Sequence, residues 1–348
     1  MQTTGNWLKL YSLGFILSSE FTAVYTGVTY TGSVWEYNGI HGPAHWHEGY
    51  PDCAGVMQSP VAIQSKKATF DVSLLQFGFK GFSELVQANM TMKNNGHTVQ
   101  VDIVDTSLRT HGGGVTGGYK PVQFHFHWGA DNTKGSEHVI DDHHYPMEMH
   151  IVHYSDRFQK IEDAIDKPDG LLVLGFFFEI GRHNIHFEEV FNYLENVAHK
   201  DDTTEIPPVI MERLVPIDLV HYYRYRGSLT TPPCYESVVW TVFTQPITIS
   251  SSQMSDFRNK IKKTTVNATH EEDLVDDFRP LQQLNGRNVY SSFVTQKPST
   301  QAPQTVQPIN VVCQHSHDDT NNAISTSLSL FVIFISILTS GFMYGHKM

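Results

Sequence analysis

Basic residues are scarce in this sequence. Its 348 residues include 24 Lys and Arg against 36 Asp and Glu, a formal net charge of −12, and the pI is near 5.9. Proteins that bind nucleic acids gather Lys and Arg on one face to neutralise phosphates. The acidic balance therefore argues against a nucleic-acid partner.

Two sequence signatures are also missing. No repeat of fixed period occurs, which argues against solenoids and propellers. No Gly-x-Ser-x-Gly segment occurs either, and this segment forms the turn that presents the nucleophile in many serine hydrolases. The serine hydrolase class therefore has no support.

The C-terminal apolar run is short. A membrane-spanning helix needs roughly 20 apolar residues, whereas the run at 328–342 has about fifteen, and Lys347 is the one Lys or Arg after it. Small and polar residues at 318–323 precede it, as in the signal for a glycosylphosphatidylinositol (GPI) anchor. We expect 324–348 to be a hydrophobic tail that directs GPI anchoring, with a short transmembrane segment as the alternative.

The other terminal features fit a secreted chain. At the N-terminus, Lys9 and the apolar run 10–17 are typical of a signal peptide, which we place at 1–27. Asn89-Met-Thr and Asn267-Ala-Thr are N-glycosylation sequons. Residues 296–323, rich in Pro, Thr and Gln, should form a linker. The expected location is the extracellular face of the cell membrane, reached through the secretory pathway.

Residues 30–295 remain for a folded domain. Short apolar or alternating segments separated by Gly, Pro and Asn predict strands at 98–104, 123–128, 147–154, 171–179 and 237–243. The best helical patterns are 184–197 and 251–262. The sequence thus predicts a single mainly β domain with peripheral helices.

Histidine is abundant, with 20 residues, several of them between His125 and His153. His125 and His127 share a strand-like segment, in which alternate side chains point to the same face. Three imidazoles with an open fourth position are typical of catalytic zinc. Spacing alone leaves the third ligand open among the nearby histidines His138, His143, His144, His150 and His153.

Two polar residues precede histidines by two positions. Gln123 precedes His125, and Glu148 precedes His150. The two residues of each pair share a strand face. Each polar side chain could therefore accept a hydrogen bond from the ring nitrogen that does not bind the metal.

A series of segments resembles a known family. In order they are Trp35-Glu-Tyr-Asn-Gly-Ile-His-Gly-Pro-Ala-His-Trp, Gln58-Ser-Pro-Val-Ala-Ile, Asn95-Gly-His97, Gln123-Phe-His-Phe-His-Trp-Gly, Gly135-Ser-Glu-His138, Glu148-Met-His-Ile-Val-His153, Gly227-Ser-Leu-Thr-Thr-Pro-Pro233 and Phe278-Arg-Pro-Leu-Gln. The match runs in this order from about residue 33 to residue 293. The chain resembles the α-class carbonic anhydrases, and its linker and tail resemble the secreted and membrane-attached subgroup.

The resemblance implies a fold and a metal site. The fold is a large, twisted, mostly antiparallel central sheet with the metal at the foot of a conical cleft. It names His125, His127 and His150 as ligands of Zn²⁺. It also implies that Cys53 pairs with Cys234, which leaves Cys313 free or bonded to another chain.

The resemblance also implies an activity: reversible hydration of carbon dioxide to bicarbonate and a proton, by attack of zinc-bound hydroxide. Thr230 would orient the hydroxide and donate its own hydroxyl to Glu137, since a carboxylate only accepts. His97 would carry the proton to solvent, and Tyr37 would belong to the solvent network. Thr231 would hydrogen-bond bicarbonate.

Carbon dioxide is uncharged, so its binding surface should be apolar. The positions that match the family's apolar wall are Val152, Val173, Leu229, Val238 and Trp240. The alternative function is a catalytically silent cell-surface binding module of the same fold. Such relatives lack one or more zinc histidines, whereas this chain has all three. The motifs carry no prediction about the oligomeric state.

Overall fold

The computed structural model describes residues 34–74, 76–86, 90–104 and 107–295, together with the backbone of two short strands at 24–25 and 28–29. The expected signal peptide lies largely outside the described residues. The linker 296–323, the tail 324–348, Asn89 and Cys313 lie wholly outside them. Within the described ranges, no helix is both long and apolar enough to cross a membrane.

Strands predominate in the described chain. They are β1 (Val24–Tyr25), β2 (Val28–Thr29), β3 (Ala62–Ile63), β4 (Thr69–Phe70), β5 (Phe77–Lys80), β6 (Met90–Asn94), β7 (Val99–Asp102), β8 (Arg109–Gly112), β9 (Gly118–Trp128), β10 (Val139–Ile140), β11 (Met147–Ser155), β12 (Leu171–Ile180), β13 (Thr203–Ile206), β14 (Tyr222–Gly227), β15 (Val238–Phe243), β16 (Ile247–Ile249) and β17 (Tyr290–Ser291). The α-helices are α1 (Trp46–Gly49), α2 (Ile161–Ala164), α3 (Ile185–Phe191) and α4 (Ser251–Lys260), and the 3₁₀ helices are η1 (Gly39–His41), η2 (Pro51–Ala54), η3 (Ser65–Lys67), η4 (Leu194–Val197) and η5 (Met211–Leu214).

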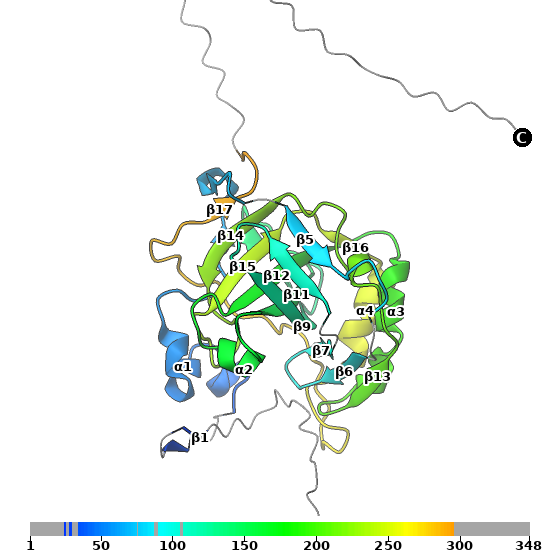
Figure 1. The fold of residues 1–348 in the computed structure, drawn as a ribbon. Coiled ribbons are helices and arrows are strands. Elements are labelled where there is room, and N and C mark those ends of the chain that lie inside the picture. Colours follow the sequence, from blue (N-terminus) through cyan, green and yellow to red (C-terminus); the bar gives the residue numbers. More distant parts are fainter. Residues whose placement is uncertain are drawn as a thin grey trace, which may run out of the picture. The chain divides into compact units, whose positions relative to one another are not determined.

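One large sheet organises the domain (Figure 1). Its main path is β13-β6-β7-β9-β11-β12-β15-β14-β17-β4. Off this path, β16 pairs with β12, β8 pairs with β9, and β5 pairs with β8. Most neighbours are antiparallel, but β12 runs parallel to β15 and β16, and β17 runs parallel to β4. The prediction of a mainly β fold with a mostly antiparallel sheet is confirmed.

The central strands are buried on both faces. Leu172 and Leu174 of β12 pack in the larger apolar cluster with Phe126, whereas Val173 packs with Trp240 in a second cluster. The two sets separate because successive side chains of a strand point to opposite faces. This explains why 171–179 reads as a continuous apolar run.

The helix predicted at 184–197 is two helices. Asn184 caps α3 by accepting a hydrogen bond from the backbone N–H of His186, and η4 follows after Tyr193, whose φ of −99° and ψ of 0° leave the helical region. Phe187, Val190, Phe191, Leu194 and Val197 are all buried, so the apolar stripe continues across the break. Periodicity therefore could not reveal it.

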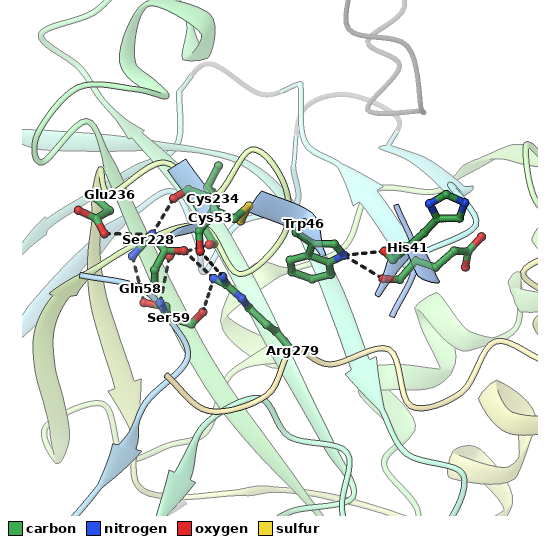
Figure 2. Close-up of a disulfide and its surroundings, with 11 residues drawn as sticks. His41, Trp46, Cys53, Gln58, Ser59, Ser228, Cys234, Glu236 and Arg279 are labelled. Carbon is green, nitrogen blue, oxygen red and sulfur yellow. Dashed lines mark hydrogen bonds between the residues drawn. A yellow bond between two sulfur atoms is a disulfide. The ribbon is translucent and has the colours of Figure 1, made fainter. Parts of the chain in front are cut away.

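A disulfide joins Cys53 to Cys234, as expected. Beside it, Arg279 donates to the side chain of Gln58 (2.7 Å) and to the carbonyl of Cys53 (3.1 Å), and Gln58 donates to the carbonyl of Cys234 (3.1 Å) (Figure 2). These contacts fasten the segment before β3 to the loop between β14 and β15. That loop carries Thr230 and Thr231.

Replacing both cysteines, by Cys53→Ser and Cys234→Ser, should lower the free energy of unfolding by about 2–5 kcal/mol, because the bond closes a long loop in the unfolded chain. The two cysteines lie 181 positions apart. Denaturant unfolding without reductant measures the difference. Equal stability of the double variant and the oxidised protein would contradict this account.

Candidate metal centre

The pairing of β9 with β11 brings three histidines to one face of the sheet. His150 lies directly opposite His125, and His127 lies opposite Glu148, two positions along. The ring centroids are 5.2 Å apart for His125 and His150, 5.0 Å for His125 and His127, and 4.7 Å for His127 and His150. The register therefore places His150, and not His153 of the same strand, beside His125 and His127.

One nitrogen of each ring is engaged by a hydrogen bond. Nδ1 of His125 lies 2.8 Å from Oε1 of Gln123, and Nδ1 of His127 lies 2.7 Å from the carbonyl oxygen of Asp277. Nε2 of His150 lies 2.7 Å from Oε1 of Glu148. Each acceptor takes the ring N–H and so fixes the tautomer.

The remaining nitrogens converge. Nδ1 of His150 is 3.3 Å from Nε2 of His125, and candidate ligand atoms of the three residues lie within 4.8 Å of one another. Nε2 of His127 is buried and has no hydrogen-bond partner among the described residues. A metal ion that accepts three lone pairs would satisfy this arrangement, so the residues fit a zinc ion.

Burial keeps the rings of His125 and His127 neutral. Desolvation, with the neighbouring histidines, holds the pKa of His125 well below its ordinary value, and desolvation also lowers the pKa of His127. Burial acts this way because the charged imidazolium loses more hydration than the neutral ring. Neutral imidazole is the form that ligates a metal.

Glu148 connects the site to a second histidine. His138 donates its backbone N–H to Oε2 of Glu148 (2.8 Å), and its Nδ1 lies 2.7 Å from Oε1. Burial would raise the pKa of the Glu148 carboxyl, but His138 and His150 together bring this pKa well below its ordinary value. His138, Glu148 and His150 could also form a ligand group, but these hydrogen bonds already use their facing atoms.

The other candidate histidines lie elsewhere. His143 and His144 are exposed. His153 is buried, with Nε2 3.0 Å from the hydroxyl of Thr110 and Nδ1 3.0 Å from the carbonyl of Ile151. The three therefore have no place among the converging nitrogens.

Glu137 and Thr230 are both buried. Oε1 of Glu137 accepts from the backbone N–H of Arg279 (2.9 Å). Its Oε2 lies 3.5 Å from Nε2 of His127 and 3.9 Å from Nδ1 of His150. This oxygen has no hydrogen-bond partner within the described chain, so the bond expected from Thr230 is not formed in this structure.

His97 lies in the turn between β6 and β7. Its ring stacks on Trp35, with centroids 3.7 Å apart and an interplanar angle of 12°, and its Nδ1 is buried with no described partner. Burial, aided by the charge of Lys200, lowers the pKa of His97 to about 4. The ring centroids of Tyr37 and His97 are 6.5 Å apart. Burial, and to a smaller extent the charge of Glu137, raises the pKa of Tyr37 well above its ordinary value.

The five apolar positions singled out from the sequence come together. Val152, Val173, Val238 and Trp240 belong to one buried cluster, and Leu229 packs against it. The Trp240 ring lies 4.8 Å from the ring of His150, so the cluster adjoins the converging nitrogens. Thr231 lies in the neighbouring loop, where its carbonyl accepts from the backbone N–H of Cys234 (2.9 Å).

Sequence reasoning missed two contributors to this site. Asp277 supplies the carbonyl that orients His127 from 150 positions away in the chain, so no local spacing could reveal it. Tyr225 holds the second nitrogen of His138 at 2.7 Å. The one available signal was the position of Asp277 immediately before the Phe278-Arg-Pro-Leu-Gln segment.

Comparisons with known proteins agree with the geometry. The model of the eukaryotic-type carbonic anhydrase family matches residues 41–293. Carbonic anhydrase 12 from Homo sapiens is 36% identical over 264 residues, which are 75% of this chain and 74% of the relative. Carbonic anhydrase 7 from Homo sapiens is 39% identical over 268 residues, 74% of this chain and 97% of the relative. The chain belongs to the eukaryotic-type carbonic anhydrase family.

Proposed function

We propose that this enzyme catalyses the reversible hydration of carbon dioxide to bicarbonate and a proton at a zinc ion held by His125, His127 and His150. One observation carries the proposal: three ring nitrogens converge, and each ring is oriented through its other nitrogen. Eukaryotic-type carbonic anhydrases are zinc enzymes, and the family match supports the same reaction here.

When bound, zinc supplies a nucleophile at neutral pH by lowering the pKa of water to about 7, the accepted value for carbonic anhydrases. The protein contributes uncharged ligands, which leave the full positive charge on the ion. Neutral imidazoles do this, whereas thiolates would partly cancel it. The low pKa values of His125 and His127 keep these two rings in the required form.

Glu137 and Thr230 orient the nucleophile in this proposal. Oε2 of Glu137 is buried and has no hydrogen-bond partner among the residues that the structure describes, and a carboxylate accepts but does not donate. If the Thr230 hydroxyl donates its hydrogen to Oε2 of Glu137, the lone pairs of the hydroxyl oxygen can accept only from the nucleophile. The hydrogen bonds then have a single direction, which aims the attacking lone pair at the substrate.

The apolar cluster at Trp240 would receive carbon dioxide. It is buried and adjoins His150, and an apolar surface suits a substrate without charge. Thr231, in the loop fastened by the disulfide, would hydrogen-bond bicarbonate.

His97 would carry the proton out of the site. In the stacked position its pKa of about 4 is too low for it to hold a proton at neutral pH. A ring that swings away from Trp35 into water regains an ordinary pKa near 6.5. Protonation of His97 is therefore coupled to departure of the ring from Trp35.

We also propose that the chain is secreted, glycosylated and attached to the outer face of the membrane through its C-terminal tail. Asn267, in the second sequon, is exposed in a turn, which makes it accessible to modification. Attachment rests on the apolar run at 328–342. Release from cells by a phosphatidylinositol-specific phospholipase would distinguish a GPI anchor from a transmembrane segment.

His150→Ala should abolish zinc retention and carbon dioxide hydration. Loss of a residue that orients a ligand weakens metal binding by up to about 100-fold, and loss of the ligand itself should weaken zinc binding by more than this. Chelator competition measures the affinity, and stopped-flow hydration measures the activity. His153→Gln is the matched control, because His153 is a buried histidine of the same strand. Hydration that survives His150→Ala would contradict the proposal.

Thr230→Val should lower kcat/KM for hydration by about 100-fold while zinc content stays at one per chain, because the isosteric valine removes the orienting hydroxyl but no ligand. Glu137→Gln should give a similar loss, since an amide can donate in place of accepting. Stopped-flow kinetics with metal analysis separates the two effects. Unchanged kcat/KM in both variants would show that this hydrogen bond plays no part.

Trp35→Ala should raise the pKa of His97 from about 4 towards 6.5, because the stacked indole is part of the surface that desolvates the ring. NMR titration of the imidazole measures this value. In the same series, His97→Ala should lower kcat in weak buffer by at least about 10-fold, with recovery on addition of imidazole. A turnover number that does not change in weak buffer would refute the shuttle role.

A further inference from the structure

Four exposed apolar side chains lie around the point where the described chain ends. They are Phe70 (47% exposed), Val72 (79%), Val220 (45%) and Val294 (63%), and we refer to them as the apolar collar. Isolated exposed apolar residues are ordinary on a protein surface. A group of them at one place usually marks a surface that another body covers.

Backbone pairing holds the members of the collar close together. Phe70 of β4 lies opposite Ser291 of β17, and Asp71 donates its N–H to the carbonyl of Ser291 (3.0 Å). Ser292 donates its hydroxyl to the carbonyl of Val220 (2.6 Å). Val294 follows two positions later. The collar therefore surrounds the segment by which the chain leaves the domain.

Charges of both signs surround the collar, which suits a zwitterionic surface. The Asp71 carboxylate accepts from the backbone N–H (2.9 Å) and the hydroxyl (2.7 Å) of Ser73. The Asp218 carboxylate accepts from the N–H groups of Val220 and His221. Lys66 and Lys67, just before β4, are exposed. Although burial acts in the opposite direction at Asp218, these hydrogen bonds hold the pKa values of Asp71 and Asp218 below their ordinary values, so both acids stay charged beside the exposed lysines.

The collar is remote from His97, to which the proposal assigns the export of protons. β17 lies near one end of the domain, whereas α1 and the β6–β7 turn, which carries His97, lie near the opposite end (Figure 1). A surface that covers the collar would leave the route of substrate and protons open.

We infer that the apolar collar rests on the lipid bilayer surface to which the tail is attached. This rests on the membrane attachment proposed above. The chain continues for 53 residues beyond Thr295, to position 348, and the apolar run at 328–342 is near its end. If the 28 residues at 296–323 form a flexible linker, its end-to-end distance is roughly 30 Å.

Tethering makes a weak contact sufficient. A short flexible tether holds its two ends at an effective concentration in the millimolar range, so a millimolar affinity of the collar for lipid keeps a large part of the population docked. The apolar side chains would enter the interfacial region, with the two lysines near the phosphates. Docking would then orient the β6–β7 turn, which carries His97, away from the membrane.

Hydrogen exchange of the full chain tests this inference. The protein is reconstituted through its own tail into phosphatidylcholine vesicles and compared with protein cleaved from the same vesicles in the linker. If about two thirds of the molecules are docked, amides in 66–74 and 291–295 should exchange roughly three-fold more slowly on vesicles, whereas those around α1 should be unaffected.

Two triple variants give the matched comparison. Phe70→Ser, Val72→Ser and Val294→Ser together should remove the protection. Ile40→Ser, Ile185→Ser and Val266→Ser change exposed apolar residues elsewhere (79%, 64% and 63%) and should leave it intact. Carbon dioxide hydration should be the same in both variants, which shows that the domain remains folded.

The other outcomes are distinguishable from one another. Equal exchange on vesicles and in solution, or protection that survives in the collar variant, overturns lipid docking alone. A full chain that does not float with the vesicles overturns membrane attachment together with docking. Loss of zinc or of hydration in the wild-type protein bears on the proposed reaction and leaves the docking result readable.

Discussion

Three imidazole rings in the middle of the sheet each have one nitrogen engaged by a hydrogen bond and the other turned towards a common point. Two things produce this arrangement. The register of β9 against β11 places His125 opposite His150, and the acceptors Gln123, Glu148 and the carbonyl of Asp277 fix the rings. A buried ring nitrogen without a partner is costly in the folded state. A metal ion that accepts a lone pair from each ring would remove this cost.

The rest of the domain supports this centre from a distance. Glu148 is held by His138, which Tyr225 holds in turn. The backbone N–H of Arg279 donates to Glu137, and the guanidinium of the same residue donates to the carbonyl of Cys53 beside the disulfide. The loop with Thr230 and Thr231 is thereby connected to the segment before β3, far away in sequence. Residues to which the proposal assigns a part in the chemistry are thus held by partners to which it assigns none.

The sequence predicted the fold class and several strands, because alternation and apolar runs report directly on burial. It could not predict the break between α3 and η4, because Leu194 and Val197 continue the apolar stripe of α3. Spacing alone left the third ligand open, and only the family resemblance chose His150. The stacking of His97 on Trp35 and the role of Asp277 depend on contacts between distant segments, which periodicity does not encode.

X-ray absorption at the zinc edge, on the full-length protein purified without added metal, tests the central claim most directly. The account predicts one zinc per chain with three imidazole nitrogens at about 2.0–2.1 Å and one further light-atom ligand. A spectrum with sulfur ligands, a fourth imidazole, or no bound zinc would contradict it.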